Sequence, residues 1–251
     1  MRKFLILYWL MLMTAKLVTA QDTDHKLSLD DIFKSNEFRT VSTTDIKSMK
    51  NGEHYAGISN DSLNLYSYKS GKLIKTIITT RDLINNDDSV QIPLRNFEFS
   101  DDETKIAIRT ETERIYRHSS RSHYYIYNLE KSTLTSLSLN GKQQLGTFSP
   151  DGNKMAFVRD NNLFIKDLEH LSESQITEDG EQNKIINGAP DWVYEEEFGF
   201  AQGYQWSPDG NKIAYYRFDE TQVKEFQMTL WGALYPKQQK FKYPKAGEDN
   251  S

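Results

Sequence analysis

One short turn motif recurs along this chain and constrains the fold more than any other feature. Ser149-Pro-Asp-Gly-Asn-Lys-Met-Ala156 is nearly repeated over residues 207–214, with a weaker copy at 100–107 and a degenerate one at 49–56. The alanines that end the copies fall at positions 56, 107, 156 and 214, at intervals of 51, 49 and 58 residues. A repeat of this length indicates that one supersecondary unit is used several times.

The chemistry of the motif is that of a tight hairpin turn. Proline presets φ at the first turn position, and Asp-Gly supplies a residue that tolerates positive φ. An aromatic residue precedes each of the clearer copies, and an alternating strand follows. Further strand patterns cover residues 63–66, 124–127 and 163–165, with fourth strands over 73–78 and 134–137. A jelly roll or immunoglobulin-like sandwich would have strands without this recurring turn. Three or four strands per repeat predict an all-β fold, a partial β-propeller of about four blades.

The last interval is longer than the others, and the excess lies between residues 187 and 201. Pro190-Asp191 stands there before a run of good helix formers, Trp192 to Phe198. Asp191 is well placed as the N-cap residue. The pattern predicts a short helix inserted into one blade connection, and functional residues often lie on such excursions from a rigid scaffold.

The predicted helix carries three consecutive carboxylates, Glu195, Glu196 and Glu197. Successive helical residues are about 100° apart, so at most two of the three can converge on one point. A primary ammonium suits such a pair, because its three N–H donors can meet carboxylate oxygens. A solvated helix face, a salt-bridge partner and a Ca²⁺ site remain alternatives. Ca²⁺ sites usually draw ligands from an Asp/Asn/Gly loop, which is not the pattern here.

Composition excludes several classes of chemistry. The chain has no cysteine, which excludes disulfides, thiolate metal sites and thiol catalysis. The net charge of −5 argues against nucleic acid, which requires a basic patch. The five histidines lack metal-type spacing, and we expect neither a metal nor a cofactor.

The first twenty residues have the layout of a secretory signal peptide. Arg2 and Lys3 form a positive start, an apolar run covers residues 4–13, and Val18-Thr-Ala20 offers a cleavage site before Gln21. An uncleaved membrane anchor is the alternative, but the run is shorter than the roughly 20 residues of a span. We therefore expect export to a bacterial periplasm or envelope, without a stable membrane anchor. The predicted organisation is signal peptide 1–20, lead segment 21–40 and propeller 41–251.

The acidic motif also carries a family resemblance. Asp191-Trp-Val-Tyr-Glu-Glu-Glu197, followed by Gln205-Trp-Ser-Pro-Asp-Gly210 and Tyr243-Pro-Lys-Ala-Gly-Glu248, resembles the dipeptidyl peptidase IV family of serine peptidases. Upstream, Tyr116-Arg-His-Ser119 fits the same family. The resemblance covers roughly residues 30–251. It implies that about half of an eight-bladed propeller is present.

The resemblance also implies roles for individual residues. The last two glutamates of the family motif bind the free N-terminal ammonium of the substrate, and they match Glu196 and Glu197. A family arginine that contacts the carbonyl of the substrate's second residue matches Arg117. We expect Glu195 to support the helix, Trp192 and Tyr194 to pack it onto the propeller, and His118 to be structural.

The implied reaction is removal of N-terminal dipeptides with Pro or Ala in second position, by a Ser-Asp-His triad in a C-terminal α/β-hydrolase domain. No Gly-x-Ser-x-Gly nucleophile motif occurs in this sequence. We expect a truncated chain that recognises substrate but is inactive alone. Homodimers are usual in the family. A non-catalytic periplasmic propeller that binds peptides or proteins is the alternative; a cytosolic prolyl oligopeptidase relative is disfavoured by the signal peptide and the acidic motif.

Overall fold

The computed structural model describes residues 27–40, 46–84 and 91–251, and the predicted signal peptide lies outside these residues. The chain divides into two compact units, Met1–Thr43 and Thr44–Ser251. In the first unit, helix α2 (Leu29–Phe33) begins at a capping box in which Ser28 and Asp31 bind each other's backbone N–H groups. No helix within the described residues is both long and apolar enough to cross a membrane.

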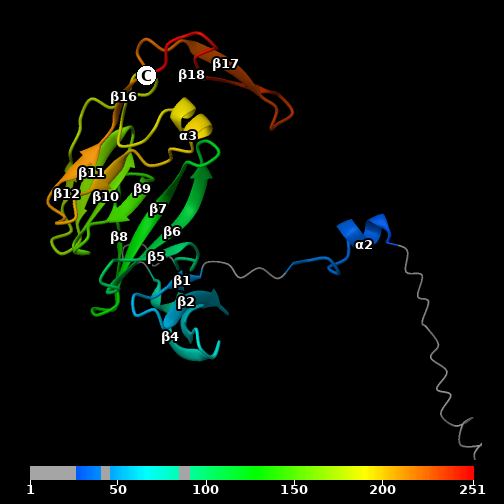
Figure 1. Cartoon of the computed structure of the whole chain (residues 1–251), viewed down its shortest axis with the longest axis vertical. Helices are drawn as coiled ribbons and strands as arrows, with labels where there is room; N and C mark the ends of the chain where they lie inside the picture. Colours follow the sequence, from blue (N-terminus) through cyan, green and yellow to red (C-terminus); the bar gives the residue numbers. More distant parts are fainter. Residues whose placement is uncertain (1–26, 41–45, 85–90) are drawn as a thin grey trace, which may run out of the picture. The chain divides into compact units, whose positions relative to one another are not determined.

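The second unit contains three four-stranded antiparallel sheets (Figure 1). The first sheet has the strand order β1-β2-β3-β4, with β1 Lys47–Ser48, β2 His54–Ser59, β3 Ser62–Ser67 and β4 Leu73–Thr79. The 3₁₀ helix η1 (Thr80–Asp82) follows β4. The second sheet has the order β5-β6-β7-β8, with β5 Phe97–Phe99, β6 Lys105–Arg114, β7 Ser120–Asn128 and β8 Thr133–Ser136. The third has the order β12-β11-β10-β9, with β9 Gln144–Phe148, β10 Lys154–Arg159, β11 Asn162–Asp167 and β12 Glu173–Gln175. Neighbours in sequence are neighbours in each sheet, as in propeller blades, so the predicted all-β, partial-propeller fold is confirmed.

The recurring motif forms the turn between the first two strands of a sheet, as predicted. In the β9–β10 turn, Ser149 Oγ donates to Asp151 Oδ1 (2.5 Å) and accepts from Lys154 N (2.9 Å). Gly152 adopts a φ of 68°, in the left-handed region that favours glycine. Ser100 and Ser207 make equivalent bonds in their own copies. The serine thus closes the hairpin from within in these three copies, whereas the degenerate copy has Met49 at this position.

The copy at 207–214 differs from the others because its second strand changes partner. The predicted strand over 212–216 is divided into β15 (Ile213–Tyr215), which pairs with β14 (Tyr204–Trp206), and β16 (Arg217–Asp219), which pairs with β13 (Ile185–Asn187). At the junction, Tyr216 N donates to Gly203 O (2.8 Å) and Gly188 N donates to Tyr216 O (3.0 Å). The inserted helix therefore stands where two short two-stranded sheets replace one blade.

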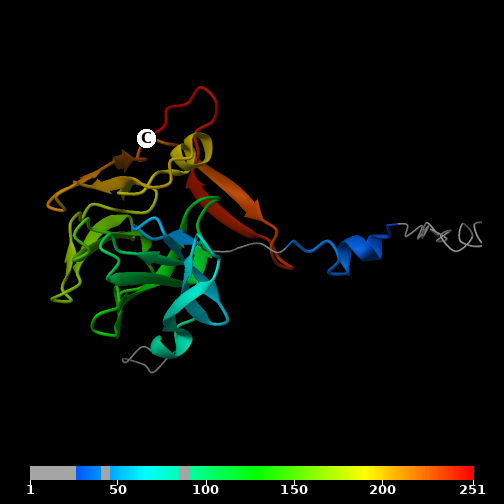
Figure 2. The ribbon, with the colours of Figure 1, turned by 60° about the horizontal axis from the view of Figure 1, so that its bottom comes forward.

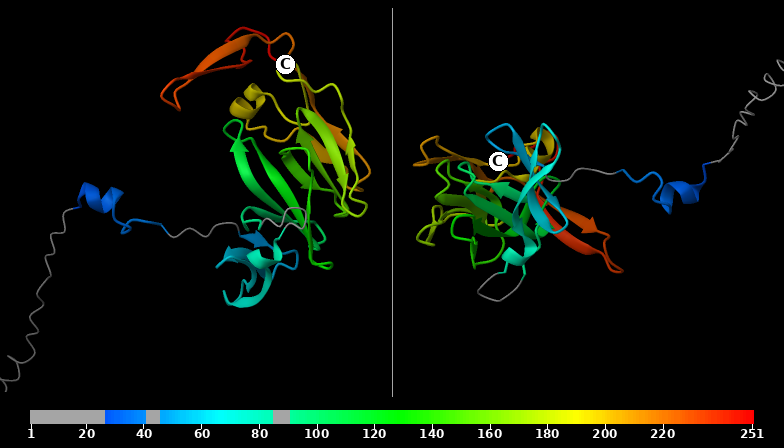
Figure 3. Two further views of the ribbon diagram at one scale, coloured as in Figure 1. Left: turned by 180° about the vertical axis from the view of Figure 1, so that it is seen from behind. Right: turned by 90° about the horizontal axis from the view of Figure 1, so that it is seen from below.

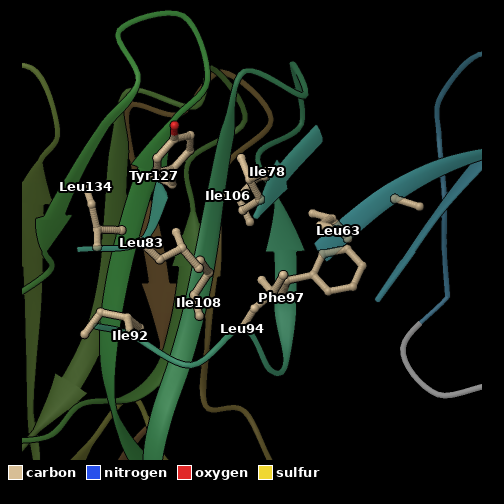
Figure 4. Close-up of a cluster of buried hydrophobic side chains, with 11 residues drawn as sticks. Leu63, Ile78, Leu83, Ile92, Leu94, Phe97, Ile106, Ile108, Tyr127 and Leu134 are labelled. Atoms are coloured by element: carbon tan, nitrogen blue, oxygen red, sulfur yellow. The ribbon is translucent and has the colours of Figure 1, made fainter. Parts of the chain in front are cut away.

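The core lies between consecutive sheets. The largest cluster joins the first sheet to the second (Figure 4). It is built from fully buried aliphatic side chains such as Leu63, Leu83, Ile106 and Ile108. Two further clusters join the second sheet to the third and the third to the strands that flank the inserted helix. Four consecutive residues of β10, from Met155 to Val158, are buried, because both faces of this strand are covered.

A last hairpin, β17 (Glu225–Leu230) with β18 (Lys237–Lys242), forms a separate two-stranded sheet. In Figures 2 and 3 it projects beyond the four-stranded sheets, from a base close to the inserted helix. Its tip exposes Trp231, Leu234 and Tyr235.

Candidate functional site

The inserted helix forms where the sequence predicts it. Helix α3 runs from Trp192 to Phe198, and its N-cap Asp191 accepts a hydrogen bond from Tyr194 N (2.8 Å). It ends at Gly199, whose φ of 63° is the left-handed C-cap conformation. The two ends of the inserted segment meet at Gly188 and Gly203, where Gly203 N donates to Gly188 O (3.1 Å). A Cβ on Gly203 would lie 2.7 Å from the Gly188 carbonyl carbon, so this closure requires glycine.

Two aromatic side chains fix the orientation of α3. Trp192 packs against Tyr243, with ring centroids 4.5 Å apart, and against Phe241. Tyr194 packs on Phe218 of β16, with centroids 5.0 Å apart. Aromatic contacts of this kind add specificity to the burial they provide. Tyr194 therefore packs the helix onto β16, as predicted, whereas Trp192 packs it against β18 and the residue that follows this strand.

The second part of the site is the loop between β6 and β7. These strands form the longest ribbon of the molecule, and their tip lies beside α3 (Figures 1 and 3). The loop is closed by Ile115 N, which donates to Ser119 O (3.0 Å), and by Tyr116 N, which donates to Ser119 Oγ (3.2 Å). This tight turn places three successive backbone N–H groups, those of residues 117–119, toward the helix.

The carboxylate of Glu195 joins the helix to this loop. Its Oε1 accepts from His118 N (2.7 Å) and Ser119 N (2.8 Å), and the residue is 1% exposed. We expected Glu195 to support the helix; it instead holds the loop that carries Arg117. Its burial excludes a wholly solvated face for the acidic run. Nothing in the sequence signals this pairing across 76 residues.

The next glutamate contacts the arginine itself. Glu196 Oε2 pairs with Arg117 Nε at 3.0 Å, and its Oε1 accepts from Arg117 N (3.3 Å). The Glu196 side chain is 13% exposed, whereas that of Arg117 is 73% exposed. Glu197 is also exposed and follows Glu196 on the same helix. The structure therefore brings Glu196 and Arg117 together, and the exposed Glu197 is next to Glu196 on the helix.

A buried acidic group that sequence reasoning missed lies behind the loop. Burial, aided by Asp191, raises the pKa of Glu220 to about 7. Burial, together with the charges of Glu220, Glu195 and Asp191, also raises the pKa of Tyr116 to about 12. Tyr116, Glu195 and Glu220 line a cavity of about 370 Å³ that does not include Glu196, Glu197 or Arg117. The three residues that the resemblance implies as ligand contacts therefore lie outside this cavity.

Comparison with known proteins shows the family of this chain. Residues 100–251 match the family model described as the dipeptidyl peptidase IV (DPP IV) N-terminal region. The chain belongs to the dipeptidyl peptidase IV family. The match includes the whole of α3, the β6–β7 loop and the last three copies of the turn motif.

Several members of the dipeptidyl peptidase IV family resemble this chain. The crystal structure of Porphyromonas gingivalis dipeptidyl peptidase 4 superposes with a TM-score of 0.79 at 40% identity over 89% of this chain and 32% of that one. The probable dipeptidyl-aminopeptidase B of Podospora anserina is 38% identical over 60% of this chain and 18% of its own length. Prolyl endopeptidase FAP of Homo sapiens is 33% identical over 79% of this chain and 26% of its own. The chain therefore spans between about a fifth and a third of these relatives.

Proposed function

We propose that this chain is the substrate-recognition part of a secreted serine-type dipeptidyl peptidase that removes N-terminal Xaa-Pro or Xaa-Ala dipeptides. Within it, Glu196 and Glu197 bind the free ammonium of the peptide, and Arg117 binds the carbonyl of its second residue. The observation that carries the proposal is the ion pair between Glu196 and Arg117, made by segments 79 residues apart. This pair supports the proposal because a carboxylate, which can accept from an ammonium, lies beside a guanidinium, which can donate to a carbonyl.

The charges of the site support this assignment. Arg117 uses Nε for Glu196, and its guanidinium carries further donors in a planar fork that can reach a carbonyl oxygen. Glu196 and Glu197 carry two negative charges, and the guanidinium of Arg117 neutralises only one of them. The ammonium of a bound peptide would neutralise the other. A blocked amino terminus has no such charge, so the site would select free peptide ends.

The test is peptide binding by the intact chain, measured by isothermal titration calorimetry. Gly-Pro-Ala amide is expected to bind, and its N-acetylated form is expected to lose at least about tenfold in affinity. Glu197→Gln should cause a similar loss, whereas Glu130→Gln, a charge-matched change on an exposed turn, should not. Equal binding of the free and acetylated peptides would overturn the proposal.

The cleavage step needs a separate measurement. No described residue is assigned a nucleophilic role, and we propose that the chain alone does not turn over Gly-Pro substrates. Release of a chromophore from Gly-Pro p-nitroanilide by the purified chain, abolished in Glu196→Ala, would contradict this.

Export is proposed from the first twenty residues, and a mature amino terminus at Gln21 would be its direct test. The homodimer implied by the family stays a prediction.

A further inference from the structure

A second recess lies next to Arg117 of the Glu196–Arg117 pair, and residues of β6, β7 and the loop between them supply most of its lining. Its volume is about 260 Å³. Three arginine side chains line it, those of Arg109, Arg114 and Arg117, and the rest of the lining is polar, from Asn96, Thr112, His118, Ser119 and Ser120. None of the described residues that line it carries a carboxylate. A concave surface that is lined by positively charged groups attracts anions.

A β-bulge in β6 places the arginines and the glutamates of this strand on opposite faces of the β6–β7 ribbon. Thr110 pairs with His123 and Glu113 with Arg121, so β6 holds one more residue than β7 between these pairs. Glu111, within the bulge, has a φ of 49°. An extra residue reverses the alternation of side chains that follow it. In a regular strand, Arg109 would share a face with Glu111 and Glu113; here it does not.

The register shows which residues share each face. Arg109 is opposite Tyr124, and Arg114 is opposite Ser120. Thr112 Oγ1 lies 2.8 Å from Ser122 Oγ, which places Thr112 on the same face. Since residues 120, 122 and 124 alternate on β7, the two arginines are on one face of the ribbon, with Thr112 between them.

The acidic residues of the strand are on the other face and are already paired there. Glu113 binds Arg121 (2.9 Å) and Lys142 (2.7 Å). Glu111 lies 3.8 Å from both Lys142 Nζ and His123 Nε2. These carboxylates therefore do not neutralise the recess.

Arg117 connects the recess with the proposed ammonium site. Its Nε faces Glu196, while the same side chain lines the recess. A peptide whose ammonium lies at Glu196 and Glu197 would thus place its first side chain within reach of a basic surface. An acidic side chain can accept charge-assisted hydrogen bonds there from guanidinium groups.

We propose that this recess is a subsite for a carboxylate of the bound peptide, the side chain of an acidic residue at or near its amino terminus. The inference rests on the proposed function, because the ammonium site brings the peptide to the recess. Arg109 and Arg114 are its determinants. Neither belongs to the proposed ammonium site.

The experiment compares matched peptides on the intact chain by calorimetry. Asp-Pro-Ala amide should bind about fivefold more tightly than Asn-Pro-Ala amide at low salt, and the difference should shrink at high salt. Arg114→Gln and the double variant with Arg109→Gln should remove the difference and leave binding of the Asn peptide unchanged. Arg81→Gln, an exposed arginine outside the recess, is the matched control.

Two further arms identify the source of the carboxylate. Asn-Pro-Ala with a free carboxyl terminus is expected to bind like its amide; tighter binding that depends on Arg114 would assign the recess to the peptide terminus and overturn the side-chain assignment. Inorganic phosphate should compete with the Asp peptide more than with the Asn peptide. Equal affinities of the Asp and Asn amides would overturn the subsite while leaving the ammonium site standing. Binding of neither peptide would overturn both.

Discussion

The buried carboxylate of Glu195 accepts a hydrogen bond from the backbone N–H of Ser119, 76 residues earlier in the chain, at 2.8 Å. The same oxygen accepts from His118 N. The neighbouring Glu196 meets the preceding residue, Arg117, through both backbone and side chain. Two consecutive glutamates of one short helix thus hold three consecutive residues of a distant loop. The position of Arg117 depends on the helix, and the site forms only when both elements are folded.

Replacement of Glu195 tests this dependence. Glu195→Ala leaves the backbone N–H groups of His118 and Ser119 without their acceptor, and we expect a loss of about 2–4 kcal/mol in the free energy of unfolding. Glu195→Gln keeps a neutral acceptor and should cost less. Urea denaturation measures both. In peptide binding, Glu195→Ala should add little to the loss caused by Arg117→Ala, because it acts through that residue. Fully additive losses would argue against this coupling.

Arg117 should matter for binding far more than for stability. Its ion pair with Glu196 is largely exposed on the arginine side, and such pairs contribute about 0–1 kcal/mol. We expect Arg117→Ala to leave the unfolding midpoint nearly unchanged while weakening peptide binding about tenfold or more. Arg117→Lys should rescue binding only in part, because an ammonium lacks the planar fork. Full rescue by lysine would show that Arg117 contributes only its positive charge to binding.

The turn serine should contribute according to its burial. Ser149 is fully buried, and its Oγ serves both Asp151 and the Lys154 backbone. Ser207 makes the same bonds in a more exposed hairpin. We expect Ser149→Ala to destabilise the chain by about 1–2 kcal/mol and Ser207→Ala by less. Thermal denaturation measures the loss of stability in the two variants, which carry the same change in different copies of the motif. The reverse order would contradict the assigned role of burial.

Glu220 should make stability depend on pH. Its pKa is about 7 in the folded chain, above the ordinary value of 4.5. A carboxyl whose pKa is raised by folding contributes its full stability below pH 4.5 and loses it as the pH rises through 7. Glu220→Gln should therefore stabilise the chain by about 1–2 kcal/mol at pH 8 and have little effect at pH 4.5. Urea midpoints at the two pH values measure this. A variant that stabilises equally at both would exclude ionisation as the cause.

Much of the fold could be read from local residues. The Ser149-Pro-Asp-Gly152 turn requires particular φ values and a hydroxyl, so its chemistry and spacing predict hairpins at each copy. The cap at Asp191 and the run of helix formers from Trp192 to Phe198 likewise predict α3. The division of the strand after Tyr215 could not be predicted, because Tyr216 takes its backbone partners from Gly188 and Gly203, on either side of the insertion.

The candidate site, like the fold, could be predicted from the sequence only in part. Glu196, Glu197 and Arg117 were predicted from a motif, and the structure brings the pair Glu196 and Arg117 into contact. The charge segregation around Arg109 and Arg114 depends on a bulge that alternation alone does not reveal. The raised pKa of Glu220 depends on burial by distant segments.

The sequence by itself determined the hairpins, the length of the repeat, the inserted helix and the glutamates that it carries, because turns, caps and helix formers act over a few residues. Only the tertiary structure decided what those glutamates contact. Glu195 is buried against the amides of His118 and Ser119, and Glu196 holds Arg117. Hydrogen bonds between segments so far apart in the chain depend on how the blades pack, and no local pattern encodes that packing.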